Sequence, residues 1–196
     1  CMDRWNAYEK RTVRDGYAVC HCSIFQWVLP ALIFFMHNVI CHDKDGNSFE
    51  VPTSELRFCP SVYAVIIRDN QILLGPQWWD GYSLPWWRIE LGESIEAALV
   101  REVKEETGYD IEMGWLLDCQ SSFFRTNTSK RNIQSILLFY TATVVWGELS
   151  IDGLEEGEKA WMGMAEWIDI DRLPELKFYG SVDMLSIIQK HIFFHK

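Results

Sequence analysis

Three glutamates near the end of one predicted helix form the most informative group in the chain. The helix is expected over residues 94–107, from a Ser suited to capping to the Gly at 108 that ends it. At about 100° per residue, Glu102 and Glu106 fall inside its apolar stripe and Glu105 falls at the border. Carboxylates one turn apart near the negative end of a helix repel one another unless a cation compensates them. Oxygen-only ligands suit Mg²⁺ or Mn²⁺, so the pattern predicts a site for one of these ions.

A second interpretation places Glu102 and Glu106 where the stripe runs out, so that both side chains simply reach water. That interpretation would suit an arbitrary helix. The third carboxylate beside the pair, Glu105, favours the cation.

The same residues carry a family resemblance. Glu93 is followed by seven residues and then by the run Arg101-Glu102-Val103-Lys104-Glu105-Glu106-Thr107-Gly108-Tyr109. Residues 87–109 resemble the Nudix box, the signature of the Nudix hydrolases, and every specified position matches except the first, which is Trp87 instead of Gly. The surrounding segments resemble the family over residues 55–195, and the first 50 residues lie outside the resemblance.

The resemblance implies a fold and a reaction. The fold is of the α/β class, an α/β/α sandwich of helices around a mixed β-sheet. The reaction is hydrolysis of a nucleoside diphosphate linked to another group, with a nucleotide sugar or a nucleoside triphosphate as open choices. By position, the divalent ions would be held by Glu102, Glu105, Glu106 and the backbone carbonyl of Trp86.

Further roles follow from the same resemblance. Glu93 would orient the site, and Arg101 would form an ion pair with Glu93 that is structural as much as catalytic. The metal would neutralise phosphate charge and acidify a water, and a carboxylate would accept the proton. Two sources of that base remain open. One is Glu102, and the other is the later acidic loop, with Glu155, Glu156 and Glu158.

The chain departs from the family at Trp86 and Trp87, where the box loop commonly has glycines. Glycine reaches positive φ freely, whereas a bulky residue there costs about 1 to 2 kcal/mol. Three interpretations are open: retained activity, with the indoles packing outward or on a base; a weakened or inactive enzyme that still binds nucleotide; and an altered chain.

Several residues near the box are candidates for contact with the substrate. Aromatic side chains before it could stack on a base, and basic side chains near it could bind phosphates or a sugar. Core packing or a solvated hairpin tip are the alternatives. The aromatic candidates are Trp78, Trp79 and Tyr82, and the basic ones are Arg88, Arg125, Lys130 and Arg131. The chain lacks a Pro between residues 86 and 173 and a Tyr between 110 and 139, so two common subfamily marks are missing.

The elements that must position these residues follow from hydrophobic periodicity and turn signals. Hairpins are predicted around residues 43–47 and 69–70, and long strands over 111–124 and 133–149. A short strand is expected over 167–170 and a final amphipathic helix over 181–191. We divide the chain into an N-terminal extension, 1–50, and a Nudix domain, 51–196.

Composition bounds the class of protein. The chain has 196 residues, of which 48% are hydrophobic and 23% charged, so a mainly disordered protein is excluded. Its formal net charge of −10 argues against a free-standing nucleic-acid binder, and a phosphorylated, nucleotide-type substrate would need a metal ion or a local basic patch. Ten residues are Trp, and four of them lie between positions 78 and 87.

The N-terminal part leaves alternatives open. Residues 17–41 carry no Asp, Glu, Lys or Arg, which is compatible with a membrane span or signal anchor, although Pro30 and polar residues oppose it. The other interpretation is a buried helix followed by a strand, with a homodimer contact as one use of the segment. The irregular cysteine spacings predict reduced thiols in a cytoplasmic protein. A zinc site assembled from Cys20, Cys22, Cys41 and His42 is an alternative that lacks the usual paired spacing.

Overall fold

A computed structural model describes residues 37–77, 80–126, 129–154, 156–157, 159–160 and 162–194. The chain divides into two compact units, Cys1–Met36 and His37–Lys196, and the second is described below. Most of the apolar stretch 17–41, with Cys20 and Cys22 of the zinc alternative, lies outside the described residues. Within the described ranges, no helix has the length and apolar character needed to cross a membrane. The division into an extension, 1–50, and a domain, 51–196, stays a prediction.

The second unit is built on a mixed β-sheet of ten strands. Its strands are β1 (Asn38–His42), β2 (Ser48–Pro52), β3 (Leu56–Phe58), β4 (Ser61–Arg68), β5 (Gln71–Gln77), β6 (Gly81–Ser83), β7 (Trp86–Arg88), β8 (Tyr109–Arg125), β9 (Asn132–Gly147) and β10 (Glu166–Asp169). The main path runs β10-β5-β4-β9-β8-β1-β2, while β3 pairs with β9, β6 with β5 and β7 with β4. Strand β9 is parallel to β3 and β4, β1 is parallel to β8, and the other pairs are antiparallel.

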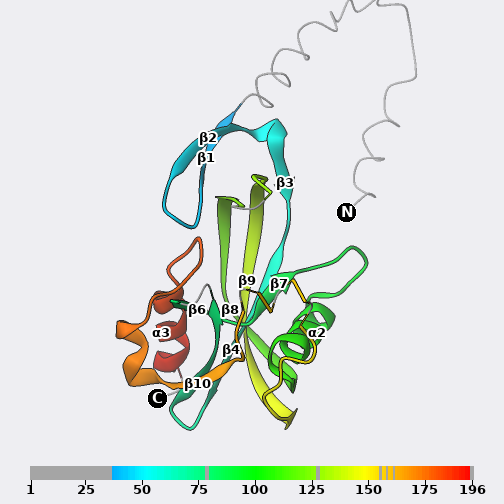
Figure 1. The fold of residues 1–196 in the computed structure, drawn as a ribbon, viewed down its shortest axis with the longest axis vertical. Helices are drawn as coiled ribbons and strands as arrows, with labels where there is room; N and C mark the ends of the chain where they lie inside the picture. The colour runs from blue at the N-terminus through cyan, green and yellow to red at the C-terminus, as the bar shows by residue number, and fades with distance from the viewer. Residues whose placement is uncertain are drawn as a thin grey trace, which may run out of the picture. The chain divides into compact units, whose positions relative to one another are not determined.

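Two helices cover opposite faces of this sheet (Figure 1). They are α2 (Ile95–Thr107) and α3 (Met184–Phe194), and two short 3₁₀ helices, η1 (Thr53–Glu55) and η2 (Ile170–Glu175), lie in connections. Because side chains alternate along a strand, β4 serves both layers. Val62, Ala64 and Ile66 pack with α2, whereas Tyr63 and Val65 pack with α3. The predicted α/β/α sandwich with a mixed sheet is thereby confirmed.

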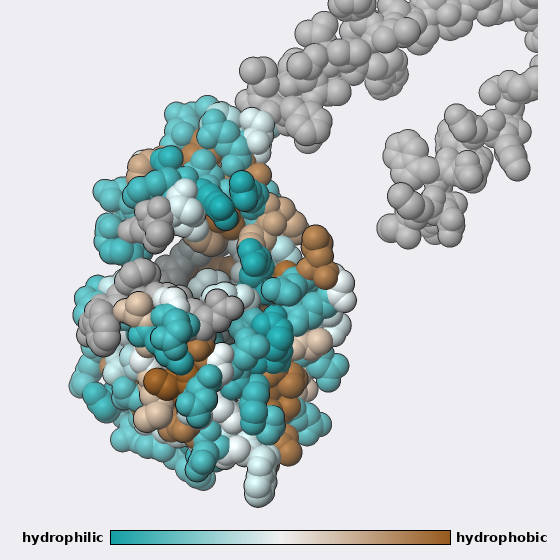
Figure 2. Space-filling model, turned by 45° about the vertical axis from the view of Figure 1, so that its right-hand side comes forward, coloured by the Kyte–Doolittle hydropathy of each residue, from teal (hydrophilic) through white to brown (hydrophobic). Residues whose placement is uncertain are grey.

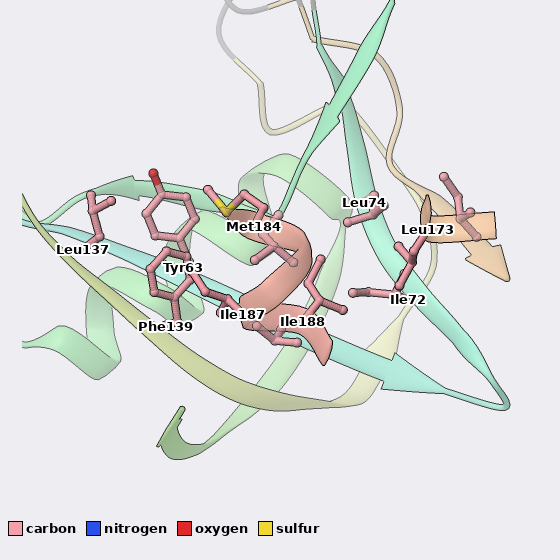
Figure 3. Close-up of a cluster of buried hydrophobic side chains, with 12 residues drawn as sticks. Tyr63, Ile72, Leu74, Leu137, Phe139, Leu173, Met184, Ile187 and Ile188 are labelled. Atoms are coloured by element: carbon pink, nitrogen blue, oxygen red, sulfur yellow. The ribbon is translucent and has the colours of Figure 1, made fainter. Parts of the chain in front are cut away.

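The α3 side of the sheet carries the larger side chains of the core. Figure 3 shows Tyr63 beside Phe139, with Met184, Ile187 and Ile188 of α3 in the same cluster. These five side chains are at most 6% exposed. On the outside of the unit, hydrophilic residues dominate the face drawn in Figure 2, which fits the acidic composition.

The predicted hairpins and long strands are present. Asp69 and Asn70 have φ values of 52° and 61°, the conformation of a two-residue turn that joins twisted strands, here β4 and β5. The turn between β1 and β2 contains Gly46 at φ 81°. The last helix begins three residues later than predicted, at Met184, because the carboxylate of Asp183 accepts the amide of Ser186 at 3.1 Å and caps it there.

Candidate active site

Helix α2 presents its acids as the sequence predicts. Ser94 caps its first turn, since its hydroxyl accepts the amide of Ala97 at 3.1 Å, and Gly108 ends it in the left-handed conformation at φ 81°. Between these ends, Glu102 and Glu106 are 4% and 5% exposed. The interpretation in which both side chains simply reach water is therefore wrong. Two buried carboxylates one turn apart need compensating charge or hydrogen bonds, because burial of a lone carboxylate is costly.

Strand β7 supplies one partner of this pair. The backbone amide of Trp86 donates to Oε2 of Glu106 at 3.1 Å. Along β7, the bonds to β4 involve Pro85 and Ile89, through Ala64 N to Pro85 O at 2.9 Å and Ile89 N to Pro60 O at 3.0 Å. In an antiparallel pair such bonds recur at every second residue, so the N–H and C=O of Trp86 both face away from β4. The carbonyl that the resemblance assigns to a metal is thus on the same side as Glu106.

Arg101 supplies positive charge to three carboxylates, those of Glu93, Glu102 and Glu105. Its Nε and Nη2 donate to the two oxygens of Glu93 at 2.8 and 3.0 Å, and its Nη1 contacts Glu102 and lies 3.3 Å from Glu105. These bonds hold the pKa of Glu93 below its usual value, and they raise the pKa of Arg101 further above its already high one. The ion pair of Arg101 with Glu93, which the resemblance implied, is present.

The donor set suits a hard divalent cation, although the side chains are turned elsewhere. Three carboxylates, Glu102, Glu105 and Glu106, and the carbonyl of Trp86 are all oxygen donors, as Mg²⁺ and Mn²⁺ prefer. In the described part of the chain, no three His, Cys, Asp or Glu side chains converge on one point that could hold a metal. Glu102 and Glu105 turn toward Arg101 instead. The residues therefore fit the ion by chemistry, and the two Arg101 partners would have to turn to share it.

The indoles at the glycine positions are accommodated without backbone strain. Trp86 and Trp87 lie in β7, and neither is among the described residues other than Gly that have positive φ. The Trp86 ring stacks on Tyr63, with centroids 5.5 Å apart and an interplanar angle of 12°, and Trp87 lies 6.0 Å from Trp86. The expected cost of a bulky residue at positive φ therefore does not arise, since an extended strand suits large aromatic side chains.

The later acidic loop reaches the helix, and its described base candidate, Glu156, is exposed to solvent. Gly153 packs so closely on Glu105 that an added Cβ atom would lie 2.6 Å from the Cα of Glu105. Glu156 is exposed and pairs with Lys159 at 3.0 Å. Glu155 and Glu158, the other candidates for a base, lie outside the described residues.

The predicted substrate contacts are only partly brought together. Arg88 is exposed at the end of β7, two residues from Trp86. Tyr82 lies in β6 and packs against the core on the α3 side. Arg125 stacks over Phe49 at 4.5 Å. Along β8 it lies seven residues, or about 23 Å, from the residue that pairs with Phe139 of β9. The structure therefore separates Arg125 from the acids.

Trp78 and Trp79 lie outside the described residues, and Lys130 and Arg131 are exposed at the β8–β9 tip.

Tyr63 also lies at this site, although the sequence gives no sign of it. It stacks between Trp86 and Phe139, and burial, together with the nearby Glu106 carboxylate, raises the pKa of its hydroxyl. Its position in a strand rich in Val and Ile gives no local signal, because its electrostatic interaction with Glu106 spans more than 40 residues of sequence.

Comparison with known proteins finds a matching family model and several relatives. The family model of the NUDIX domain matches residues 57–189. The ADP-ribose pyrophosphatase of Methanocaldococcus jannaschii is 34% identical over 123 residues, which cover 60% of this chain and 66% of that protein. The NAD-capped RNA hydrolase NudC of Vibrio atlanticus is 29% identical over 129 residues, which cover 64% of this chain and 43% of that protein. A putative nudix hydrolase 1 of Caenorhabditis elegans is 57% identical over 95 residues, which cover 39% and 26%. The chain thus spans less than two thirds of each of these relatives.

Solved structures show the same fold. A UDP-X diphosphatase superposes with a TM-score of 0.54 at 19% identity, covering 71% of this chain and 65% of that chain. The NUDIX domain of Shewanella oneidensis NrtR, solved with ADP ribose, superposes with a TM-score of 0.53 at 18% identity, covering 74% and 93%. At these identities the likeness concerns the fold alone.

Proposed function

The chain belongs to the Nudix family, and on that premise we propose that it hydrolyses the phosphoric anhydride bond of a nucleoside diphosphate linked to another group. The observation that carries the proposal is the buried pair Glu102 and Glu106 beside the outward-facing backbone of Trp86. Burial of two carboxylates is costly unless opposite charge or hydrogen bonds compensate it, and their oxygen donors suit a divalent cation.

The proposed division of labour follows the contacts. Glu102, Glu105, Glu106 and the carbonyl of Trp86 hold Mg²⁺ or Mn²⁺. When bound, the metal neutralises phosphate charge and lowers the pKa of a water. Glu93 fixes Arg101 through two hydrogen bonds, and Arg101 in turn sets the position of Glu102.

Two carboxylates remain in the proposal as the base that accepts the proton of the attacking water. Glu102 is buried beside the other acids, so it needs only a change of rotamer to act. Glu156 lies in the loop that packs on α2 through Gly153, but it is exposed and paired with Lys159, so it would have to turn inward.

The substrate class rests on the names of the relatives and on the charge of the chain. Those names include an ADP-ribose pyrophosphatase, a NAD-capped RNA hydrolase and a UDP-X diphosphatase. In each named substrate a diphosphate adjoins a nucleoside. We propose a substrate of that kind for this chain, with Arg88 as a phosphate contact and Trp79 and Tyr82 as aromatic contacts.

The test is turnover of a panel of nucleotides with Mg²⁺, with Mn²⁺ and after chelation. The panel holds ADP-ribose, nucleotide sugars, nucleoside triphosphates and NAD-capped RNA. Glu106→Gln should reduce turnover more than about 100-fold, because loss of a residue that merely supports a metal ligand already costs 10- to 100-fold. Glu96→Gln is the matched control, since Glu96 is exposed on the first turn of the same helix. Turnover that is unaffected by metal removal and by Glu106→Gln would refute the proposal.

The same panel separates enzyme from binding module. A chain that has lost catalysis through its indoles would bind nucleotide without turnover, and Trp87→Gly would restore activity. The unstrained conformation of Trp86 and Trp87 favours the enzyme.

A further inference from the structure

Four aromatic rings lie in a row at the edge of the proposed site. Phe139 stacks on Tyr63 with centroids 4.6 Å apart, Tyr63 stacks on Trp86 at 5.5 Å, and Trp86 meets Trp87 at 6.0 Å with a tilt of 39°. We call Phe139, Tyr63, Trp86 and Trp87 the aromatic row. Its members come from β9, β4 and β7, which are neighbours in the sheet.

Exposure changes along the aromatic row. Phe139 is fully buried, Tyr63 is 6% exposed, and both indoles are half-buried. Trp86 packs against the core on the α3 side, whereas Trp87 belongs to neither of the two core clusters found among the described residues. Core packing therefore accounts for the positions of the three inner rings, those of Phe139, Tyr63 and Trp86. It does not account for the position of the Trp87 indole.

The outer end of the row lies beside the acids. Trp86 donates its amide to Glu106, and adjacent Cα atoms are about 3.8 Å apart, so Trp87 begins one residue from that contact. Val62, the register partner of Trp87, packs with α2, so the Trp87 side chain leaves β7 on the face that α2 covers. The indole thus starts on the side of Glu102 and Glu106.

We propose that Trp87 is a stacking platform for the nucleobase of the substrate. This inference rests on the proposed function and assigns one part of its substrate site. A purine or pyrimidine offers a flat π face that stacks on an indole without any particular hydrogen-bond pattern. The residue that breaks the glycine pattern of the box then contributes to affinity, and it does so without backbone strain.

The experiment measures binding to the full chain, in Mg²⁺, of adenosine α,β-methylene diphosphate and of methylenediphosphonate, which lacks the nucleoside. The variants are Trp87→Leu, which keeps an apolar side chain without a π face, and Trp87→Phe, which keeps the face. Trp146→Leu is the control, because Trp146 is 77% exposed near the end of β9. Thermal unfolding of each variant checks that it is folded.

A platform predicts that Trp87→Leu weakens binding of the adenosine probe between about 5-fold and about 150-fold. Trp87→Phe should retain affinity within about 3-fold, and the control should match the wild type. Binding of methylenediphosphonate should not change in any variant.

Three results would overturn the platform: equal affinity of the Leu and Phe variants for the adenosine probe, equal weakening of both probes by Trp87→Leu, or tighter binding once the indole is removed. Metal-dependent turnover by the wild type tests the proposed function separately. An active enzyme in which Trp87→Leu leaves KM unchanged would refute the platform alone.

Discussion

Breaking the bond between Arg101 and Glu93 tests how the helix end is organised. Two nitrogens of Arg101 donate to the two oxygens of Glu93 at 2.8 and 3.0 Å, and the side chains are 33% and 15% exposed. Paired hydrogen bonds between charged groups contribute about 1.5 to 3 kcal/mol when partly buried. We therefore expect a coupling free energy in this range from a double-mutant cycle of Arg101→Ala and Glu93→Gln.

A second ion pair, between Lys104 of the same helix and Asp110 of β8, is the control. Lys104 lies 3.0 Å from Asp110, and both side chains are 48% exposed. Solvent screens such a pair, so the cycle of Lys104→Ala and Asp110→Asn should give at most about 1 kcal/mol. The assay is urea denaturation of the four proteins in each cycle, and the cycle cancels effects that the two residues have separately.

The pH dependence has a defined sign. Hydrogen bonds from Arg101 are the main cause that lowers the pKa of Glu93 in the folded state. The stabilisation is then complete above the unfolded value, about 4.3, and is lost as pH falls through the lower folded pKa. The coupling should be constant from about pH 7 to about pH 5.5 and should shrink below about pH 4. A coupling no larger than that of Lys104 with Asp110, or one that persists in acid, would refute this reasoning.

Two further predictions concern the ends of the helix and can be read by the same denaturation assay. Gly108→Ala should destabilise the protein by well over about 1 kcal/mol, because a left-handed φ of 81° is combined with a Cβ that would lie 2.9 Å from a backbone nitrogen. Gly46→Ala, with the same φ and open space around it, should cost only about 1 kcal/mol, and equal losses would contradict the steric argument. Ser94→Ala should cost about 0.5 to 2 kcal/mol through loss of the cap, whereas Ser94→Gly should cost less, and the reverse order would contradict it.

Local sequence was sufficient for the elements that depend on neighbours in the chain. The cap at Ser94, the stop at Gly108 and the hairpin at Asp69 and Asn70 were all predicted, because each is fixed by residues a few positions apart. The same hairpin implies a strand before its turn, β4, and the two core clusters show that the two faces of this strand serve different helices.

Local sequence was less informative where contacts with other strands determine the backbone conformation or the position of a residue. Strand β7 was expected to be a loop that needs glycine, yet pairing with β4 holds Trp86 and Trp87 extended. Arg125 is a candidate because it is among the basic residues nearest the box in sequence, but β8 is long and carries it away. Both errors arise from strand pairing, which joins residues distant in sequence.

The sequence by itself determined the chemistry at hand. The spacing of Glu102, Glu105 and Glu106 on one helix already specified three oxygen donors with the positive charge of Arg101 beside them. Tertiary structure decided which atoms meet. Burial of Glu106 against the amide of Trp86, 20 residues away, depends on how α2 packs against the sheet. Periodicity indicates which face of an element is apolar. Contacts between elements follow from packing, so only the folded chain shows where the indoles of Trp86 and Trp87 lie.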